Sequence, residues 1–395
     1  MKLILILSLL LFDIESFAAN PQILARSEVR KSFGLDSLSL FYDSYPVIGR
    51  DNKIYLNMNY IEAGNYGLHQ FDLNSGMNRS LFQINANFRI SEAYLAGPNH
   101  AIVSVYDDLK TYGVLSIDTQ TSSYKELFKL NEDQNVQMNS LFLRGEHLFF
   151  RYHSRSDGGQ GLGFINDSLK FSSLPKLKYS SQSYSFAPCS NSFGVFAFKE
   201  RRSKDGDLSE QKADQLVLVG IDAKKKVILS DKDFDPKSKI TKIYNHCHIN
   251  DQGDIYQVVE YDKMIHALLR YSDGEWQELA RDGQGDIGKI EYFTASSNDL
   301  GEYAFRALDS KGRQSIFLFD RYSKLILKIK KGDLVETESG EALISHIDDA
   351  SPSFAGRPAL SNYGLAFISF LVTPDQKNSL GHALYYYHLR SKNLY

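Results

Sequence analysis

The residues best suited to metal chemistry stand together in the stretch NHCHIN, which contains His246, Cys247 and His248. In an extended strand, alternate side chains point to opposite faces, so the two histidines would share one face and the cysteine would occupy the other. Zinc accepts two histidines at this spacing, but a structural zinc site needs four ligands. The sequence names no third ligand, so the identity of any metal stays open.

Aspartates alternate in the stretch DKDFDP, at Asp231, Asp233 and Asp235, as the acidic ligands of calcium-binding loops do. The glycine expected next is Pro236, and the twelfth position of such a loop is Lys242 rather than glutamate. The full calcium-loop pattern therefore fails. An irregular Ca²⁺ site stays open beside the simpler interpretation of a solvated acidic loop, and the sequence predicts no other cofactor.

Two charged segments carry the other candidate binding residues. They are residues 199–214 and the glycine-rich residues 153–164, and the candidates within them are Arg201, Arg202, Asp205, Asp207, His153 and Asp157. Glycine lets backbone amides approach an anion, and loops over a rigid scaffold are where binding residues concentrate. Each segment is equally well explained as a solvated charged loop.

No group of residues has a recognisable catalytic arrangement. The 10 histidines are scattered, and no serine or cysteine has the local context of an activated nucleophile. We therefore assign no catalytic residue, and the sequence favours a protein that binds rather than catalyses. Catalytic sites assembled from distant segments leave no local motif, so an enzyme stays open as an alternative.

A repeat indicates the elements that position these residues. Residues 191–198 and 298–305 both read Asn-x-x-Gly-x-x-Ala-Phe. Glycine at the fourth position supplies a left-handed backbone conformation, and the asparagine side chain can close the turn. Partial copies complete seven units spaced roughly 50 residues apart, centred on Asn52, Asn99, Gly145, Gly194, Gly253, Gly301 and Gly364.

Each unit contains four short, aromatic-rich strands, and such a sheet cannot bury both of its faces alone. Radial repetition buries them, so the sequence predicts an all-β, seven-bladed β-propeller with four-stranded antiparallel blades, six or eight blades being possible. The seventh unit lacks its outer strand, and residues 34–42 are predicted to close the ring by supplying it. A single domain is expected over residues 20–395.

The two cysteines, Cys189 and Cys247, precede the turn glycines of neighbouring units, Gly194 and Gly253, by five and six residues respectively. They are therefore expected at nearly the same level of blades four and five. We predict a structural disulfide between them, which an exported protein would form in an oxidising compartment. Two free buried thiols are the alternative, because the offset of one residue leaves the Cβ separation undecided.

The N-terminus predicts export. Lys2 precedes an apolar run too short to span a bilayer, and the small residues Ser16 and Ala18 fit a signal peptide that is cleaved after Ala18 or Ala19. Removal of residues 1–19 would leave a secreted or periplasmic protein without a transmembrane segment. The net charge of −3 excludes a strongly basic nucleic-acid-binding surface, and we expect a monomer.

The Asn-x-x-Gly-x-x-Ala-Phe element resembles a family of exported bacterial proteins built from tandem repeats of that motif. The stretch ASPSFAGRPALSNYGLAFISF, residues 350–370, is similar to blades of the Tol translocation propeller and of prolyl-oligopeptidase propellers. Those peptidases also carry a hydrolase domain with a Gly-x-Ser-x-Gly elbow, for which the repeats leave no room here. The resemblance implies a β-propeller outside the cytoplasm and no particular activity.

These features predict an exported binding or scaffolding propeller that recognises a protein or an envelope glycan. Antiparallel strands place the Asn-Gly turns on one face and the long connections on the other, and we expect the partner on this insertion-bearing face. The alternative is a glycan-active hydrolase or lyase whose acidic, histidine and tyrosine groups converge at the mouth of the central channel.

Overall fold

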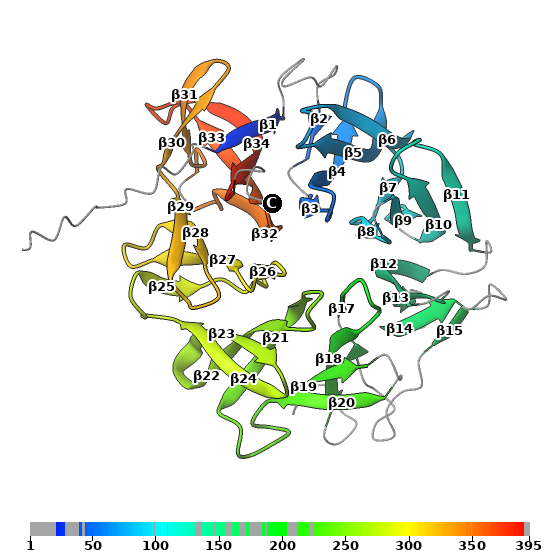
Figure 1. The fold of residues 1–395 in the computed structure, drawn as a ribbon, viewed down its shortest axis with the longest axis vertical. Helices are drawn as coiled ribbons and strands as arrows, with labels where there is room; N and C mark the ends of the chain where they lie inside the picture. The colour runs from blue at the N-terminus through cyan, green and yellow to red at the C-terminus, as the bar shows by residue number, and fades with distance from the viewer. Residues whose placement is uncertain are drawn as a thin grey trace, which may run out of the picture.

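The structure, a computed structural model, is nearly all β, and its strands form seven sheets around one axis (Figure 1). It describes residues 21–27, 39–41, 44–97, 99–108, 110–130, 136–144, 147–154, 160–165, 171–173, 184–185, 188–203, 212–220, 224–348 and 350–390. The predicted signal peptide, residues 1–19, lies outside these ranges. Within them, no helix has the length and apolar character needed to cross a membrane.

In each of the first four blades, the strands pair with their neighbours in sequence from the inner strand, which is split in two in blades one, two and four, to the outer strand. Blade one contains β2 (Ser39–Leu40), β3 (Val47–Ile48), β4 (Lys53–Tyr60), β5 (Asn65–Asp72) and β6 (Asn78–Asn85). Blade two contains β7 (Arg89–Ile90), β8 (Tyr94–Leu95), β9 (His100–Tyr106), β10 (Thr111–Asp118) and β11 (Tyr124–Lys129). Blade three contains β12 (Val136–Arg144), β13 (His147–Ser154), β14 (Gln160–Ile165) and β15 (Phe171–Ser173). Blade four contains β16 (Tyr184–Ser185), β17 (Cys189–Ser190), β18 (Phe196–Ser203), β19 (Lys212–Val219) and β20 (Lys225–Ser230).

Blades five and six follow the same antiparallel order, whereas blade seven also contains a hairpin, β30–β31, and takes its outer strand, β1, from near the start of the chain. Blade five contains β21 (Ile240–Ile249), β22 (Ile255–Tyr261), β23 (Ile265–Ser272) and β24 (Glu275–Arg281), with a short 3-10 turn, η2 (Asp262–Met264), before β23. Blade six contains β25 (Ile287–Ile290), β26 (Ser296–Ser297), β27 (Tyr303–Asp309), β28 (Gln314–Phe319) and β29 (Leu325–Lys330). Blade seven contains β30 (Leu334–Thr337), β31 (Gly340–Ile344), β32 (Phe354–Leu360), β33 (Gly364–Val372), β34 (Ser379–His388) and β1 (Gln22–Arg26). The seven-bladed propeller predicted from the sequence is confirmed.

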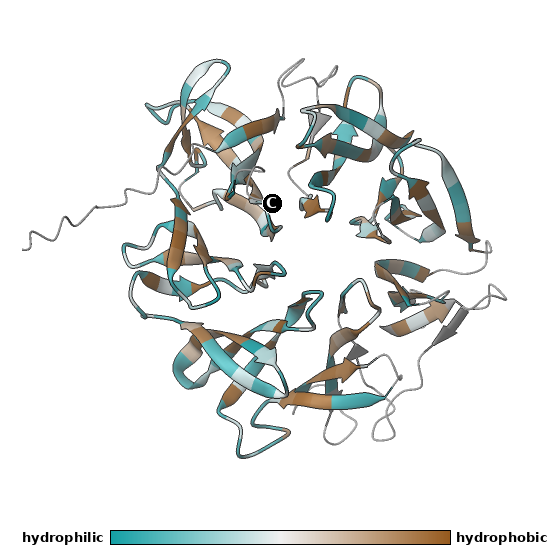
Figure 2. Cartoon of the chain, in the orientation of Figure 1, coloured by the Kyte–Doolittle hydropathy of each residue, from teal (hydrophilic) through white to brown (hydrophobic). Residues whose placement is uncertain are grey.

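The Ala-Phe pair of the repeat explains how neighbouring blades pack. Ala304 and Phe305 are consecutive on β27 and fully buried, so they face opposite sides of blade six. Ala304 lies in the core shared with blade seven, and Phe305 packs beside Tyr256 of blade five. Ala197 and Phe198 divide in the same way between the cores on either side of blade four. A small residue on one face and a large residue on the other let adjacent sheets interlock, and hydrophobic segments accordingly run through the strands of every blade (Figure 2).

The asparagine side chain closes the Asn-x-x-Gly turn, as predicted. Asn298 Oδ1 accepts the backbone N–H groups of Leu300 (3.0 Å) and Glu302 (3.1 Å), while Gly301 adopts a φ of 76°. Asn298 Nδ2 donates to the carbonyl of Ser361 in blade seven (3.0 Å). One side chain therefore closes its own turn and links it to the next blade, which explains why the motif is repeated.

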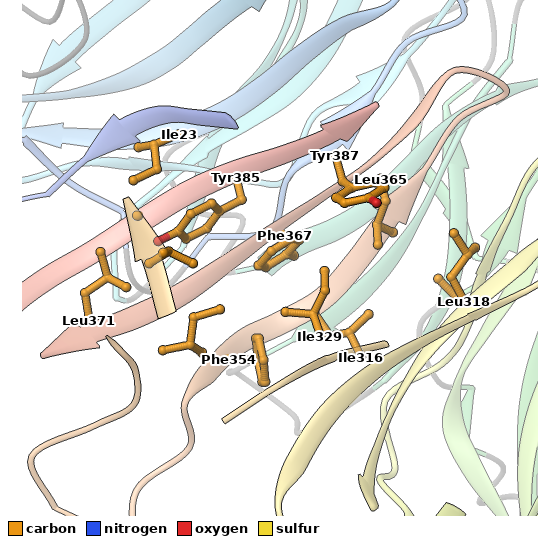
Figure 3. Packing of buried hydrophobic residues seen from close by; sticks show 14 of the residues in the cluster. Ile23, Ile316, Leu318, Ile329, Phe354, Leu365, Phe367, Leu371, Tyr385 and Tyr387 are labelled. Carbon is orange, nitrogen blue, oxygen red and sulfur yellow. The ribbon is translucent and has the colours of Figure 1, made fainter. Parts of the chain in front are cut away.

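The ring is closed by β1, which pairs antiparallel with β34 as the outer strand of blade seven. The prediction that residues 34–42 do this is wrong for the part that the structure describes, because β2 pairs with β4 in blade one. In β1, Ile23 enters the core between blades six and seven, beside Tyr385 (Figure 3), and Ala25 enters the core between blades seven and one. An outer strand between two cores must be apolar on both faces, and β1 meets this requirement. Because β1 has only five residues, its pattern of apolar residues is too short to be recognised as a strand from the sequence.

A hairpin in blade seven covers the closing strand. Strands β30 and β31 pair with each other, and the end of β31 pairs with β33. Glu338, at the tip of the hairpin, accepts a hydrogen bond from Arg26 Nη1 (3.0 Å), and Arg26 Nη2 donates to the carbonyl of Leu380 (2.8 Å). The Arg26 side chain is only 3% exposed, whereas that of Glu338 is 35% exposed, so these partly buried bonds help to hold β1 in the sheet.

Two reciprocal hydrogen bonds between the same two residues recur at the ends of the outer strands. In blade seven, the Ser27 N–H donates to the carbonyl of His382 (2.8 Å), and the His382 N–H donates back to the Ser27 hydroxyl (2.8 Å). The same exchange occurs in blades four and five, between Asp231 and Asp214 and between Asp282 and His266. Each exchange ties the end of the outer strand to the start of the third strand.

The predicted disulfide is confirmed. Cys189 on β17 and Cys247 on β21 are bonded, with a Cα–Cα distance of 5.5 Å. The bond joins the inner strands of blades four and five. The two cysteines therefore come within bonding distance although one stands five and the other six residues before its turn glycine.

Replacing Ser27 with alanine leaves the buried His382 N–H without its hydroxyl partner. We expect the free energy of unfolding to fall by about 1–3 kcal/mol, measured by urea denaturation. Ser75→Ala, in the exposed turn between β5 and β6, is the control and should change stability by less than about 0.5 kcal/mol. An equal change in the two variants would contradict the role of Ser27 in ring closure.

Replacing both cysteines with serine removes a cross-link between residues 58 positions apart. The chain-entropy relation gives a loss of about 4 kcal/mol in the free energy of unfolding, again measured with urea. Reductant should lower the stability of the wild type towards that of the double variant and leave the variant unchanged. Equal midpoints for the oxidised wild type and the variant would show that the bond adds no stability.

Candidate functional site

Inner strands of the propeller are interrupted partway along their length. In blade five the pairing of β21 with β22 shifts register between Ile243 and Cys247, and in blade seven that of β32 with β33 shifts between Ala355 and Ala359. Blade three has a smaller shift in β12, and the inner strands of blades one, two, four and six are split in two. Such breaks re-aim side chains and are frequent beside functional sites.

The interruptions carry a set of polar and aromatic residues that we call the axial ring. Its members come from blades one, two, five, six and seven, whose inner strands surround the axis (Figure 1), and they are Tyr45, Glu92, His246, Tyr292 and Arg357. The Tyr45 and Tyr292 side chains are 40% and 59% exposed. Only His246 was considered from the sequence, because the five positions share no motif.

Two ion pairs span the axis. Arg357 Nη2 donates to Glu92 Oε1 at 2.8 Å, and the two side chains are 33% and 40% exposed. Blade one separates the blades that carry these residues, so both side chains must reach inward. A second pair joins Arg50 in blade one to Asp251 in blade five, at the face of the Asn-Gly turns. Side chains therefore link non-adjacent blades at two levels of the propeller.

Buried Arg306 fixes the backbone that carries Arg357. Arg306 Nη1 donates to the carbonyl of Gly356 (2.7 Å), and its Nε forms an ion pair with Glu291 (2.6 Å). Gly356 has a φ of 56°, and a Cβ atom there would lie 1.8 Å from Tyr45 Cδ1. Only glycine therefore lets the Tyr45 ring cover this bulge, and Arg357 projects from a backbone held on both sides.

Aromatic rings and cations continue from the ring into blade five. Tyr292 stacks on Phe293, with 4.8 Å between centroids, and on Tyr244, with 6.3 Å. The Arg306 guanidinium lies 4.4 Å from the centroid of Phe293, and Lys242 Nζ lies 4.6 Å from that of Tyr244. Such contacts of cations with aromatic faces are attractive. They give the region beside the axial ring a fixed, mixed aromatic and basic surface.

The structure separates the two histidines that the sequence places together. The register shift in β21 leaves His246 exposed in the axial ring, whereas His248 Nε2 accepts the Ser297 N–H of blade six (3.0 Å). Desolvation by neighbouring groups, and then the charge of Arg357, lowers the pKa of His248 to about 3 and also lowers the pKa of His246, although the His246 residue as a whole is exposed. In the part of the chain that the structure describes, no group of three or more histidine, cysteine or acidic residues is placed to hold a metal ion.

Arg201 and Asp231, two of the binding residues predicted from the sequence, meet in one network in blade four. Asp214 accepts two hydrogen bonds from Arg201 (2.7 and 2.9 Å) and forms an ion pair with buried Lys199 (3.3 Å), and its N–H donates to Asp231 Oδ2 (2.6 Å). Lys199 also donates to the carbonyl of Ile243 in blade five (3.1 Å). Burial lowers the pKa of Lys199 to about 8 and raises that of Asp231 to about 6. The network thus links blades four and five.

The remaining predicted binding residues are not part of this network. Asp233 and Asp235 are exposed on the connection between β20 and β21, and Asp235 Oδ1 accepts the Lys237 N–H (3.0 Å). Asp231 directs both carboxylate oxygens at backbone N–H groups, whereas a calcium loop directs them at the cation. His153 lies at the end of β13, on blade three. Outside the described part of the molecule lie the Arg202 side chain and Asp157, Asp205 and Asp207.

A tyrosine–histidine–aspartate chain lies beside the axial ring and was missed in the sequence. Tyr244 Oη is 2.9 Å from His266 Nε2, and His266 Nδ1 is 2.8 Å from Asp282 Oδ2. Such a chain can pass a proton. However, His382 Nδ1 in blade seven contacts Ser27 Oγ (3.3 Å) at the equivalent place. Because both histidines contact the residue directly after the outer strand of their blade, a structural role in holding that strand accounts for the His266–Asp282 pair. The available signal was the sequence His-Ala-Leu, which occurs in both β23 (residues 266–268) and β34 (residues 382–384).

A cleft of ≈ 430 Å³ lies on the opposite face, between the Asn-Gly turns of blades five and six. Its charged lining residues are Asp254, Arg270, Asp273, Asp299 and Arg321. Because both signs of charge are present, charge alone defines no single class of ligand for this cleft.

Solved structures share the architecture at low sequence identity. The β-propeller domain of the Trilobed protease from Pyrococcus furiosus has a TM-score of 0.53 and 11% identity, over 89% of this chain and 99% of that chain. A prolyl endopeptidase has a TM-score of 0.50 and 8% identity, over 89% of this chain, which spans about half (51%) of the peptidase. TolB from Acinetobacter baumannii has a TM-score of 0.46 and 9% identity, over 72% of this chain and 65% of that chain.

The similarity to the Pyrococcus propeller domain supports the fold class, a β-propeller, and nothing narrower. No protein-family model matches the chain, and no curated protein matches it in sequence. The predicted likeness to propeller proteins therefore holds, and membership of an exported repeat family stays a prediction. The Pyrococcus propeller is described as having an open velcro topology, whereas here β1 completes blade seven.

Stability should fall in acid because the partly buried His248 is kept neutral in the folded protein. The unfolded chain takes up a proton below pH 6.5 that the folded state excludes until about pH 3, so the stability that this site contributes is complete above pH 6.5 and is lost as the pH falls. His248→Gln keeps an acceptor for Ser297 and removes this proton. The variant's unfolding free energy should fall by about 1.4 kcal/mol less per pH unit than that of the wild type between pH 6 and 4. Parallel urea-derived profiles for the two proteins would refute this assignment.

Proposed function

We propose that this protein is an exported binding or scaffolding propeller, without enzymatic activity, that recognises a partner protein through the axial ring on its insertion-bearing face. The observation that carries the proposal is the convergence of Tyr45, Tyr292 and Arg357 near the axis, on backbone held by buried Arg306. Tyrosine and arginine dominate the hot spots of protein interfaces. Rigid placement before binding lowers the entropic cost of association.

The acidic groups near the ring support binding over hydrolysis. Glu291 is paired with Arg306, Asp282 contacts His266, and Glu92 is paired with Arg357. Glycoside hydrolysis generally requires two carboxylates that flank one bond. Among the residues that the structure describes, the ring as defined here contributes one carboxylate, Glu92.

Export of the protein agrees with its disulfide, since such bonds persist chiefly in oxidising compartments. A periplasmic or extracellular location, action as a monomer and independence of any cofactor belong to the same proposal. An envelope glycan is the other partner that the exposed aromatic rings of the face would suit.

A glycan-active lyase or hydrolase is the second candidate, and one observation favours it. His246 faces the charges of Arg357 and Glu92, and its lowered pKa keeps the imidazole available as a base at neutral pH. Turnover on a panel of envelope glycans, abolished by His246→Asn, would establish an enzyme and overturn the binding proposal.

Photo-crosslinking tests the binding proposal. A benzophenone amino acid in place of Tyr292 should yield a defined protein adduct in an envelope extract, because this exposed ring would lie inside the interface. Adding Arg357→Gln should reduce the adduct yield at limiting concentration by roughly tenfold or more, as truncation of a hot-spot residue does.

The matched control is the same amino acid at Tyr322, which is 74% exposed in the turn between β28 and β29 on the opposite face. It should give no adduct with the same protein. Equal adducts at both positions, or polysaccharide adducts at Tyr292, would refute a protein partner at the axial ring.

A further inference from the structure

The pair formed by Arg357 and Glu92 differs from the other ion pairs that support blades. Arg357 and Glu92 come from non-adjacent blades, meet through one hydrogen bond of 2.8 Å, and keep a third or more of their side chains exposed. By contrast, Lys199 and Asp214 form a buried pair within blade four. An exposed pair contributes little to stability, so Glu92 can leave Arg357 without loss of the fold.

Several positive charges lie near this pair. Those of Arg357, Arg151 and Lys199 lower the pKa of His246, and the charge of Glu92 acts in the opposite direction. Burial lowers the pKa of Arg151, which indicates that this charge lies in a poorly solvated region where electrostatic attraction is stronger than in bulk water. A site of this kind attracts an anion.

The backbone geometry makes Arg357 a preformed anchor. Gly356 turns the chain with a φ of 56° under the Tyr45 ring, and Arg306 holds its carbonyl at 2.7 Å. The guanidinium therefore keeps its place when its partner changes, and its planar set of donors suits a carboxylate in bidentate contact.

We propose that Glu92 stands in for the carboxylate of an acidic peptide segment of the partner protein, which binds Arg357 in the axial ring by displacing Glu92. This inference rests on the proposed function and names the chemistry of its partner. The exposed rings of Tyr45 and Tyr292 come from blades one and six, the neighbours of the blade that carries Arg357, and supply flat contact area. Arginine side chains recognise acidic motifs in other peptide-binding proteins through the same attraction between a guanidinium and carboxylates.

A fluorescein-labelled hexaglutamate peptide is the probe, measured by fluorescence anisotropy at low salt with the mature, disulfide-bonded protein. Glu92→Gln should bind the probe about fivefold more tightly than the wild type, because the internal competitor is removed. Arg357→Gln should weaken binding by tenfold or more, and added salt should weaken binding to the wild type. Hexaglutamine and hexalysine peptides should not bind.

Asp251→Asn is the matched control, because it makes the same charge change in the other pair that spans the axis, with Arg50. It should leave the affinity for hexaglutamate unchanged, and unfolding curves should show that every variant is folded. Equal gains from Glu92→Gln and Asp251→Asn would mean that only net charge matters, and this result would overturn the inference. Preferential binding of an oligogalacturonate, lost in Arg357→Gln, would replace the peptide by an acidic glycan and overturn it as well.

The two proposals fail separately. If the folded wild type and Glu92→Gln bind no hexaglutamate while the protein adduct at Tyr292 persists, the stand-in role of Glu92 is wrong and the binding function stands. If the adduct at Tyr292 is also absent, both are wrong.

Discussion

A small antiparallel sheet with two apolar faces cannot be stable in water unless both faces are covered, and every other feature of this molecule depends on that constraint. Tyr385 and Tyr386 on β34 show how it is met. They are neighbours in sequence, both fully buried, and they belong to two different cores, one shared with blade six and one with blade one. Each blade therefore completes the core of the blade on either side, and only a closed ring leaves no face uncovered.

The same closure leaves the inner strands with no further strand to pair. Their middle parts can therefore bulge without costing contacts between blades, and the bulges deliver side chains from several blades to one place. Gly356 shows how such an irregular segment is held in place: Arg306 donates a hydrogen bond to its carbonyl, and the Tyr45 ring covers it. Rigid sheets outside and irregular backbone at the axis are the combination that a recognition surface needs.

Features carried by local residue patterns were predictable from the sequence. The Asn-x-x-Gly turns, the small–large alternation of Ala304 and Phe305 and the pairing of Cys189 with Cys247 all rest on local rules applied to a repeat. The axial ring was not predictable, because Glu92 and Arg357 come together only through the curvature of the whole ring. Register shifts in the inner strands also leave no mark in the sequence, so His246 and His248 looked alike, although His248 accepts a hydrogen bond from the next blade and His246 lies in the axial ring.

The pairing of β1 with β34 has a consequence for how the molecule is made. Ser27 and His382 are 355 positions apart, so the earliest strand to emerge during synthesis must wait for one of the last before it finds its place. Contacts this distant form slowly, and the edge of β34 stays open to other chains in the meantime. A folding chain would therefore be most vulnerable when six blades have formed and the seventh still lacks its outermost strand.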